Sequence, residues 1–153
     1  MILSLFKRVS LRHMNHIQYL TFYYSTGNMQ DASVDYALTT EENGRYTVKI
    51  IPDGVKEKDA FVTEVDEGFA DKVLAVLKQY CVGRWNGFDR IEKRILDGRS
   101  FTLNVGFLSG KSIHAHGYMC WPKNYREVKE ALNAAFMPLY RGGAVEEPPS
   151  ASV

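Results

Sequence analysis

The sequence predicts an α+β fold in which an antiparallel sheet, in the order β-β-β-α-β-β-α, carries two helices packed on one face. Three observations lead to this prediction. Apolar residues alternate with polar ones in five segments, which is the period of half-buried strands. Two later segments repeat apolar residues at helical spacing, with one stripe in each. A helix with one apolar stripe buries one side, so both helices are expected on the same sheet face.

The first three expected strands follow one another closely. Residues 17–24 are rich in aromatic and β-branched types and alternate in polarity, and residues 34–39 do the same. Asn43-Gly44 supplies the positive φ values of a type I′ turn, which leads into a third strand at residues 46–50. Pro52-Asp53-Gly54 ends this strand, because proline lacks the donor of a sheet ladder.

A charged connection over residues 56–64 precedes the first helix and allows a short strand at residues 60–64. Asp66 suits the N-cap, where its carboxylate accepts from free amides of the first turn. Gly83 is expected to end the helix. Its apolar stripe consists of Phe69, Val73, Val76, Leu77 and Tyr80.

The second half repeats the theme of a hairpin followed by a helix. Residues 89–99 are charged and are expected to form a connection. Residues 101–107 and 113–119 alternate on either side of a turn at Ser109-Gly110, which predicts a hairpin. Asn124 and Glu127 have the spacing of a capping box for the last helix. Its stripe consists of Val128, Ala131, Leu132, Ala135, Phe136 and Leu139, with Pro138 expected to end it slightly early.

These patterns predict one domain between two loose ends. Residues 1–15 belong to no clear element and are expected to be a poorly ordered extension. Residues 16–140 are expected to form a single α+β domain. Residues 141–153 are dominated by Gly, Pro, Ser and Glu and are expected to be a disordered tail.

Composition argues against several classes of protein. The chain of 153 residues has 19 basic and 18 acidic side chains, a net charge of +1, so no nucleic-acid partner is expected. No apolar run approaches the roughly 18 residues that span a bilayer, so no membrane association is expected. The two cysteines, Cys81 and Cys120, fit an intracellular protein, and a cytoplasmic location is predicted. No phosphate-loop, dinucleotide or serine-hydrolase motif occurs, and no cofactor is expected.

The chain resembles a family of small uncharacterised bacterial proteins over about residues 20–140. The resemblance rests on STGNM at residues 25–29, PDG at 52–54, WNGF at 85–88, LDGxSF at 96–101 and GYMxWPxNY at 117–125. It implies a shared fold and lineage but no activity, because the family has no assigned function. This sequence departs from the family pattern at His114 and His116, where small polar residues are more usual.

His114 and His116 are the sharpest chemical feature of the sequence. At positions i and i+2 of one strand their side chains share a face, with Cα atoms about 6.6 Å apart. Two imidazoles so placed could bind one zinc ion if a third ligand came from elsewhere. Cys120 lies about 13 Å along the strand from His116, too far to share the ion. No spacing completes a site, so no metal site is predicted.

Aromatic residues suggest a binding surface instead. Tyr118 shares the polar strand face with both histidines, and Trp121 and Tyr125 follow at the end of the strand. Exposed tyrosine and tryptophan often anchor protein interfaces. Trp85 and Phe88 are expected to close the end of the core instead.

These features predict a non-enzymatic protein-binding module that uses the open sheet face. The expected binding residues are Tyr118, Trp121, Tyr125, His114 and His116, and the expected partner is another protein or a second copy of the chain. The alternative is a small metal-dependent enzyme built on the His-x-His pair. No catalytic residues are assigned.

Overall fold

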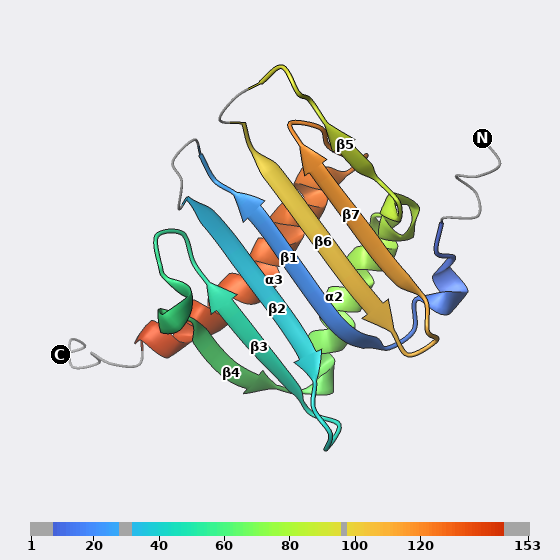
Figure 1. Cartoon of the computed structure of the whole chain (residues 1–153). Coiled ribbons are helices and arrows are strands. Elements are labelled where there is room, and N and C mark those ends of the chain that lie inside the picture. Colours follow the sequence, from blue (N-terminus) through green and yellow to red (C-terminus); the bar gives the residue numbers. More distant parts are fainter. Residues whose placement is uncertain (1–7, 28–31, 96–97, 146–153) are drawn as a thin grey trace.

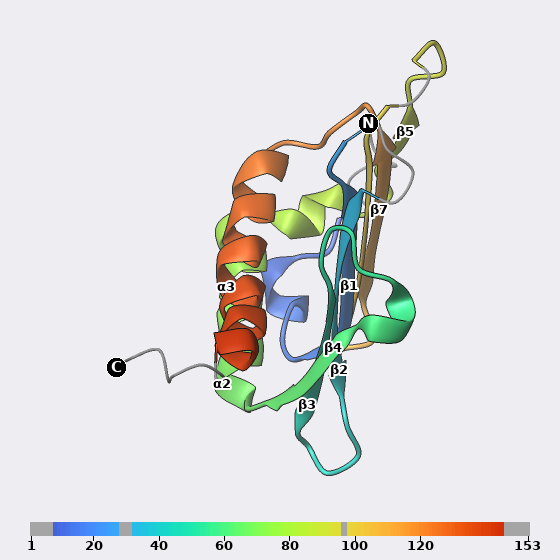
Figure 2. The same cartoon turned by 90° about the vertical axis from the view of Figure 1, so that its left-hand side faces the viewer.

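The computed structural model describes residues 8–27, 32–95 and 98–145. Seven strands form one sheet in the order β4-β3-β2-β1-β6-β7-β5 (Figure 1). Helices α2 (Glu67–Gln79) and α3 (Tyr125–Val145) lie together on one side of it, so the molecule has two layers (Figure 2). The strands are β1 (Ile17–Ser25), β2 (Ser33–Thr40), β3 (Tyr46–Ile51), β4 (Phe61–Val65), β5 (Asp89–Ile91), β6 (Ser100–Phe107) and β7 (Ser112–Tyr118).

Alternation within the strands separates a core face from an open face. Leu20, Phe22 and Tyr24 of β1 are buried beneath the helices, as are their counterparts on β2 and β6. The intervening side chains belong to the opposite face of the sheet, which is turned toward the viewer in Figure 1. This arrangement confirms the predicted α+β class with two helices. Among the described residues, neither α2 nor α3 covers the other face of the seven-stranded sheet.

The predicted order and the purely antiparallel sheet are wrong in detail, because two edge strands were not counted. The segment that allowed a short strand forms β4, antiparallel to β3. The charged segment after residue 88 begins with β5, which runs parallel to β7. The order is therefore β-β-β-β-α-β-β-β-α and the sheet is mixed. Hydrogen bonds from Gly87 N to His114 O (3.0 Å) and from His116 N to Phe88 O (2.9 Å) fix β5 beside β7.

The β2–β3 and β6–β7 hairpins each contain one glycine with a left-handed backbone in the turn. Gly44 has φ +84° and its amide donates to Glu41 O at 3.0 Å. Gly110 has φ +91° and donates to Phe107 O at 2.9 Å. One positive φ at the end of the loop is the geometry of a type I turn with a G1 bulge. The predicted type I′ turn at Asn43-Gly44, which needs two positive φ values, is therefore wrong.

The first helix begins as predicted and ends differently. The Asp66 carboxylate accepts from Phe69 N at 3.1 Å, which confirms the N-cap. The chain leaves the helix through Cys81, whose φ of 55° is left-handed. Gly83 belongs instead to the 3₁₀ helix η3 (Val82–Trp85) and is needed for close approach. A Cβ at this position would lie 2.1 Å from Val9 O.

The described part of the N-terminal segment packs on the domain. Val9 N donates to Gly83 O at 3.0 Å, and the Met14 side chain is fully buried. The 3₁₀ helix η1 (Leu11–His13) lies between them. Residues 1–7 and 146–153, to which the predicted loose ends also extend, lie outside the described residues. The limits of 16 and 140 for the domain stay a prediction.

The last helix is longer than predicted. It runs through Pro138 to Val145, so the predicted early end at that proline is wrong. Asn124 does not have the extended backbone of an N-cap, since its φ is +68°. Its side-chain amide donates to Tyr80 O at the end of α2, at 3.2 Å, and so ties the two helices together. Within the described part of the chain, neither helix has the length and apolar character needed to cross a bilayer.

Candidate functional site

A row of side chains, small at Ala37, Thr21 and Asn104, crosses the centre of the open sheet face. In the register of the sheet, Ala37 lies beside Thr21, Thr21 beside Asn104, and Asn104 beside His114. The Asn104 amide donates to Thr21 Oγ1 at 3.5 Å. Since these side chains are small, the longer side chains around them leave the face uneven rather than flat.

Each histidine of the predicted pair is held by a neighbour on β6. His114 Nδ1 lies 2.7 Å from Asn104 Oδ1, and His116 Nδ1 lies 3.2 Å from Thr102 Oγ1. An amide oxygen only accepts, so Nδ1 of His114 carries the proton and Nε2 is left to accept from a ligand. His114 is exposed and His116 is half-buried. The structure therefore places both imidazoles on the open face, as predicted.

A first hollow of about 350 Å³ opens beside the histidines at the β5 edge. Phe88 forms an aromatic wall, and the Arg90 guanidinium lies 5.8 Å from the centre of its ring. Asp89 is paired in register with His116. The side chains that line this hollow are Phe88, Asp89, Thr102, Asn104, His114 and His116.

A second hollow of about 240 Å³ lies on the same face across β1. It is lined by Thr21 and Ala37, by Asp35 and Lys49, and by Ile51 and Glu57. Lys49 Nζ lies 3.3 Å from Glu57 Oε2. Burial raises the pKa of Asp35, a shift that Lys49 opposes and Glu57 reinforces. The half-buried carboxylate of Asp35 is therefore short of solvation.

The two hollows meet where Thr21 and Asn104 touch. Each lies over a strand pair, β2 with β3 and β6 with β7, so their centres are three strand spacings or roughly 14 Å apart. The second hollow contains two carboxylates and one ammonium group, and the first contains one carboxylate and two histidines. With the histidines neutral, each hollow has a net charge of −1.

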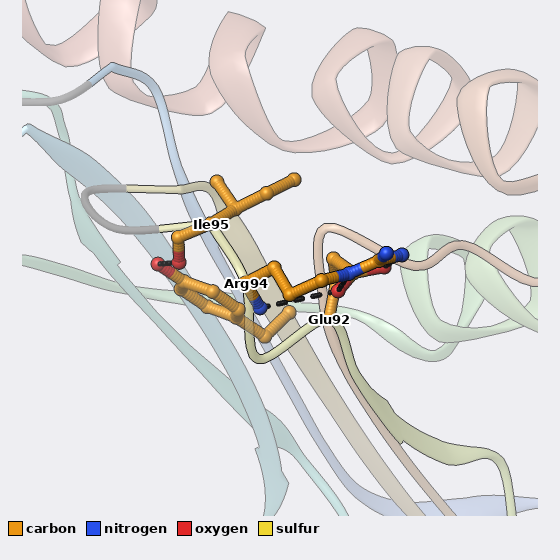
Figure 3. Close-up of polar contacts among 4 residues, drawn as sticks. Glu92, Arg94 and Ile95 are labelled. Carbon is orange, nitrogen blue, oxygen red and sulfur yellow. Dashed lines mark hydrogen bonds and ion pairs between the residues drawn. The ribbon is translucent and has the colours of Figure 1, made fainter.

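Tyr118, predicted as the leading binding residue, uses its hydroxyl to hold the neighbouring loop. Its hydroxyl donates to Ile95 O at 2.9 Å and accepts from Gly98 N at 2.7 Å. The same loop contains Arg94, whose guanidinium makes two hydrogen bonds to Glu92, 3.1 and 3.2 Å long (Figure 3). The hydrogen bonds from Arg94 lower the pKa of Glu92. The Tyr118 hydroxyl is thus already engaged within the protein.

Trp121 and Tyr125 lie on the other side of the sheet from the histidines. Both rings pack against Phe101, which is fully buried beneath the helices, with ring centres 5.9 and 4.8 Å away. The chain crosses over after β7, where Met119 has a left-handed φ of 55°. The five predicted binding residues therefore form two separate groups. Trp85 is buried against Phe101, as predicted for the end of the core.

Sequence reasoning did not select Asp35, Lys49 or Glu57. The first two occupy polar positions in the alternation of β2 and β3, which already assigns them to the open face. Glu57 belongs to the 3₁₀ helix η2 (Glu57–Asp59), and its approach to Lys49 depends on how the connection to β4 folds back. No sequence pattern indicated that approach.

The donor set for a metal ion is incomplete in the described part of the chain. No three histidine, cysteine, aspartate or glutamate side chains there stand close enough together to hold one. Cys81 and Cys120 are both free thiols.

The fold and site define a two-layer α+β protein with an uncovered sheet face. No protein-family model matches the sequence, and no curated protein is significantly similar to it.

Proposed function

We propose that the protein is a non-enzymatic module that binds another protein through its open sheet face. The observation that supports this proposal best is the pair of hollows on either side of β1, on the face that the helices leave uncovered. Hollows on a broad surface can receive anchor side chains of a partner, and such anchors contribute most of the binding energy of an interface.

The charges of the hollows favour a basic partner. With the histidines neutral, the lining side chains of each hollow carry a net charge of −1, and the desolvated carboxylate of Asp35 gains from any cation that approaches it. His114 Nε2 offers an acceptor to an N–H donor. We therefore expect a partner with two arginine or lysine side chains separated by roughly 14 Å, three strand spacings of the sheet. A second copy of the same acidic face would be repelled, so the face is not expected to pair with itself.

The alternative is a metal-dependent enzyme built on His114 and His116, which would need a third protein ligand for the metal ion. Three protein ligands are usual in catalytic zinc sites. Asp89 lines the same hollow, but among the described residues no third histidine, cysteine or carboxylate is placed to complete a metal site with the pair. Nδ1 of each ring is hydrogen-bonded to a β6 side chain, which leaves Nε2 as the nitrogen that can meet a ligand. A protein-binding role needs no ligand beyond the two rings in their present positions.

The proposal is tested by a pair of charge-matched variants. The double variant E57K/D89K reverses one exposed carboxylate in each hollow. The control D71K/E130K makes the same change in charge on exposed positions of α2 and α3. Tagged wild type and both variants are used to capture proteins from the lysate of the native host, with comparison of retained proteins by quantitative mass spectrometry.

We expect one or more basic proteins to be retained by the wild type and by D71K/E130K, and lost with E57K/D89K. Long-range attraction between opposite charges also predicts that the retained amount falls as salt is raised. Equal retention by both variants would place the interface elsewhere and contradict the proposal. A dimer by light scattering that E57K/D89K abolishes would make a second copy the occupant, also against the proposal.

A further inference from the structure

A third hollow, of about 350 Å³, lies at the opposite side of the sheet from the histidines, where β1 ends and α3 begins. Three of its lining side chains are aromatic (Tyr24, Trp121 and Tyr125) and three are basic (Arg99, Arg126 and Lys129), and Ser25 and Thr26 complete the lining. Such a combination suits a ligand that has both a planar ring and a negative charge.

The positive charge of this hollow is not neutralised by its own walls. No acidic side chain lines it. The ion pairs among the described residues involve Arg45, Lys49 and Arg94, so none uses a basic residue of this hollow. A chain with a net charge of only +1 thus gathers three cations around one hollow.

One carboxylate, that of Asp53, lies beside this hollow and is hydrogen-bonded to Thr26, one of its lining residues. Asp53 Oδ2 accepts from Thr26 Oγ1 at 3.0 Å. Lys129 Nζ lies 5.2 Å from the centre of the Tyr24 ring, a cation–π distance that holds the ammonium group over the wall. The hollow therefore retains a local excess of positive charge.

The Trp121 ring offers a free stacking surface. One side of the indole stacks on Tyr125, with ring centres 4.8 Å apart and an interplanar angle of 26°. The residue is nevertheless 40% exposed, the largest exposure of an aromatic side chain in the described chain. A planar ring placed on the outer side of the indole would extend the stack, and such base–aromatic stacking contributes about 1–3 kcal/mol.

The turn that carries Trp121 is held in place before any ligand arrives. Trp85 Nε1 donates to Lys123 O at 3.0 Å, and the Asn124 amide donates to Tyr80 O at 3.2 Å. The partners of the turn in these bonds, Trp85 of η3 and Tyr80 at the end of α2, belong to the helical side of the molecule. A preorganised turn loses little conformational freedom when a ligand binds, which favours affinity.

We propose that this hollow binds a nucleoside monophosphate, with the base stacked on Trp121 and the phosphate among Arg99, Arg126 and Lys129. Its volume is at the lower end of the range for small-molecule sites, which favours a ligand of single-nucleotide size. The site lies on the opposite face from the proposed protein interface and does not depend on it. Binding involves no covalent step.

Isothermal titration calorimetry of the full chain tests this proposal with four probes. AMP carries both parts of the ligand, whereas adenosine carries the ring alone and inorganic phosphate carries the charge alone. Phosphotyrosine carries a ring and a phosphate without the nucleoside. We expect AMP to bind at least tenfold more tightly than each of the other three. Equal affinity for adenosine or phosphate, tighter binding of phosphotyrosine, or no binding of AMP would overturn the proposal.

Three variants and a matched control locate the binding. R126A is expected to weaken AMP binding at least fivefold, whereas R12A, the same change at an exposed arginine of η1, leaves it unchanged. W121A is expected to weaken AMP binding, and W121F to retain most of it, because phenylalanine still stacks. Equal effects of R126A and R12A would show that the phosphate lies elsewhere and would overturn the assignment.

Discussion

Asn133 joins the helical layer to the sheet through two buried tyrosines. Its Oδ1 accepts from the hydroxyl of Tyr24 at 3.0 Å and also from the hydroxyl of Tyr36. Tyr36 is 1% exposed and stacks on Phe136 with ring centres 4.5 Å apart. Replacing Asn133 with alanine leaves both hydroxyls in the core without a hydrogen-bond acceptor, where water cannot easily reach them.

The cost of this replacement follows from the exposure of each tyrosine. A buried donor without a partner costs about 1–3 kcal/mol, and Tyr36 is buried deeply enough to lose nearly the full amount. Tyr24 is 8% exposed and can recover part of its loss through water. We therefore expect N133A to lower the free energy of unfolding by about 2–4 kcal/mol in urea titrations at pH 7.

A second variant separates this cause from general damage to α3. Adding Y36F to N133A removes the stranded hydroxyl, so N133A/Y36F should be about 1 kcal/mol more stable than N133A. The control Q79A, an exposed position at the end of α2, should change stability by less than about 0.5 kcal/mol. A loss below about 0.5 kcal/mol for N133A, or further destabilisation by Y36F, would refute the reasoning.

Three further predictions concern stability and local order. Burial raises the pKa of Asp35, so its ionisation destabilises the fold as pH rises through the ordinary aspartate range. The variant D35N should therefore be more stable than wild type at pH 7 and lose that advantage near pH 3. Urea titrations at both pH values measure the difference. Y118F removes the hydroxyl that bonds Ile95 O and Gly98 N, so it should speed amide hydrogen exchange in the loop before β6 and lower the free energy of unfolding by no more than about 2 kcal/mol. Unchanged exchange in this loop would show that the hydroxyl does not hold it in place. G83A should expose the segment at Val9 to limited proteolysis, because a Cβ there would meet Val9 O at 2.1 Å, whereas G27A, with nothing within 4 Å, should behave as wild type.

Five of the seven strands could be predicted because their signals are local. Alternating side chains define the core face of β1, β2, β3, β6 and β7, and glycines mark the turns between them. The Asp66 cap was equally readable, since a carboxylate before an apolar stripe has few other local uses.

Strand β5 could not be predicted from its own residues. Asp89, Arg90 and Ile91 are all exposed and show no alternation. They pair with β7 because the preceding segment is fixed by packing of Trp85 and Phe88 against Phe101. A strand specified by tertiary contacts leaves no periodic trace in the sequence.

The sequence predicted one binding surface, whereas the structure separates its residues into two groups, and this separation also depends on tertiary structure. The histidine face follows from the period of two along β7, and the structure places both rings there. Trp121 and Tyr125 lie beyond Met119, whose left-handed backbone sends the chain to the helical side. A left-handed methionine is uncommon and has no sequence signature. Hence the sequence could not separate these aromatics from the histidines.

The central claim is that the open sheet face is a protein interface, and chemical labelling of histidine tests it most directly. His114 and His16 are both exposed, and His114 lies at the edge of the first hollow. The captured complex and the free protein are treated with diethylpyrocarbonate, and the modification of each histidine is measured by mass spectrometry. The account predicts that the partner reduces labelling of His114 several-fold and leaves His16 nearly unchanged. Labelling of His114 that is equal in the free and bound protein would contradict it.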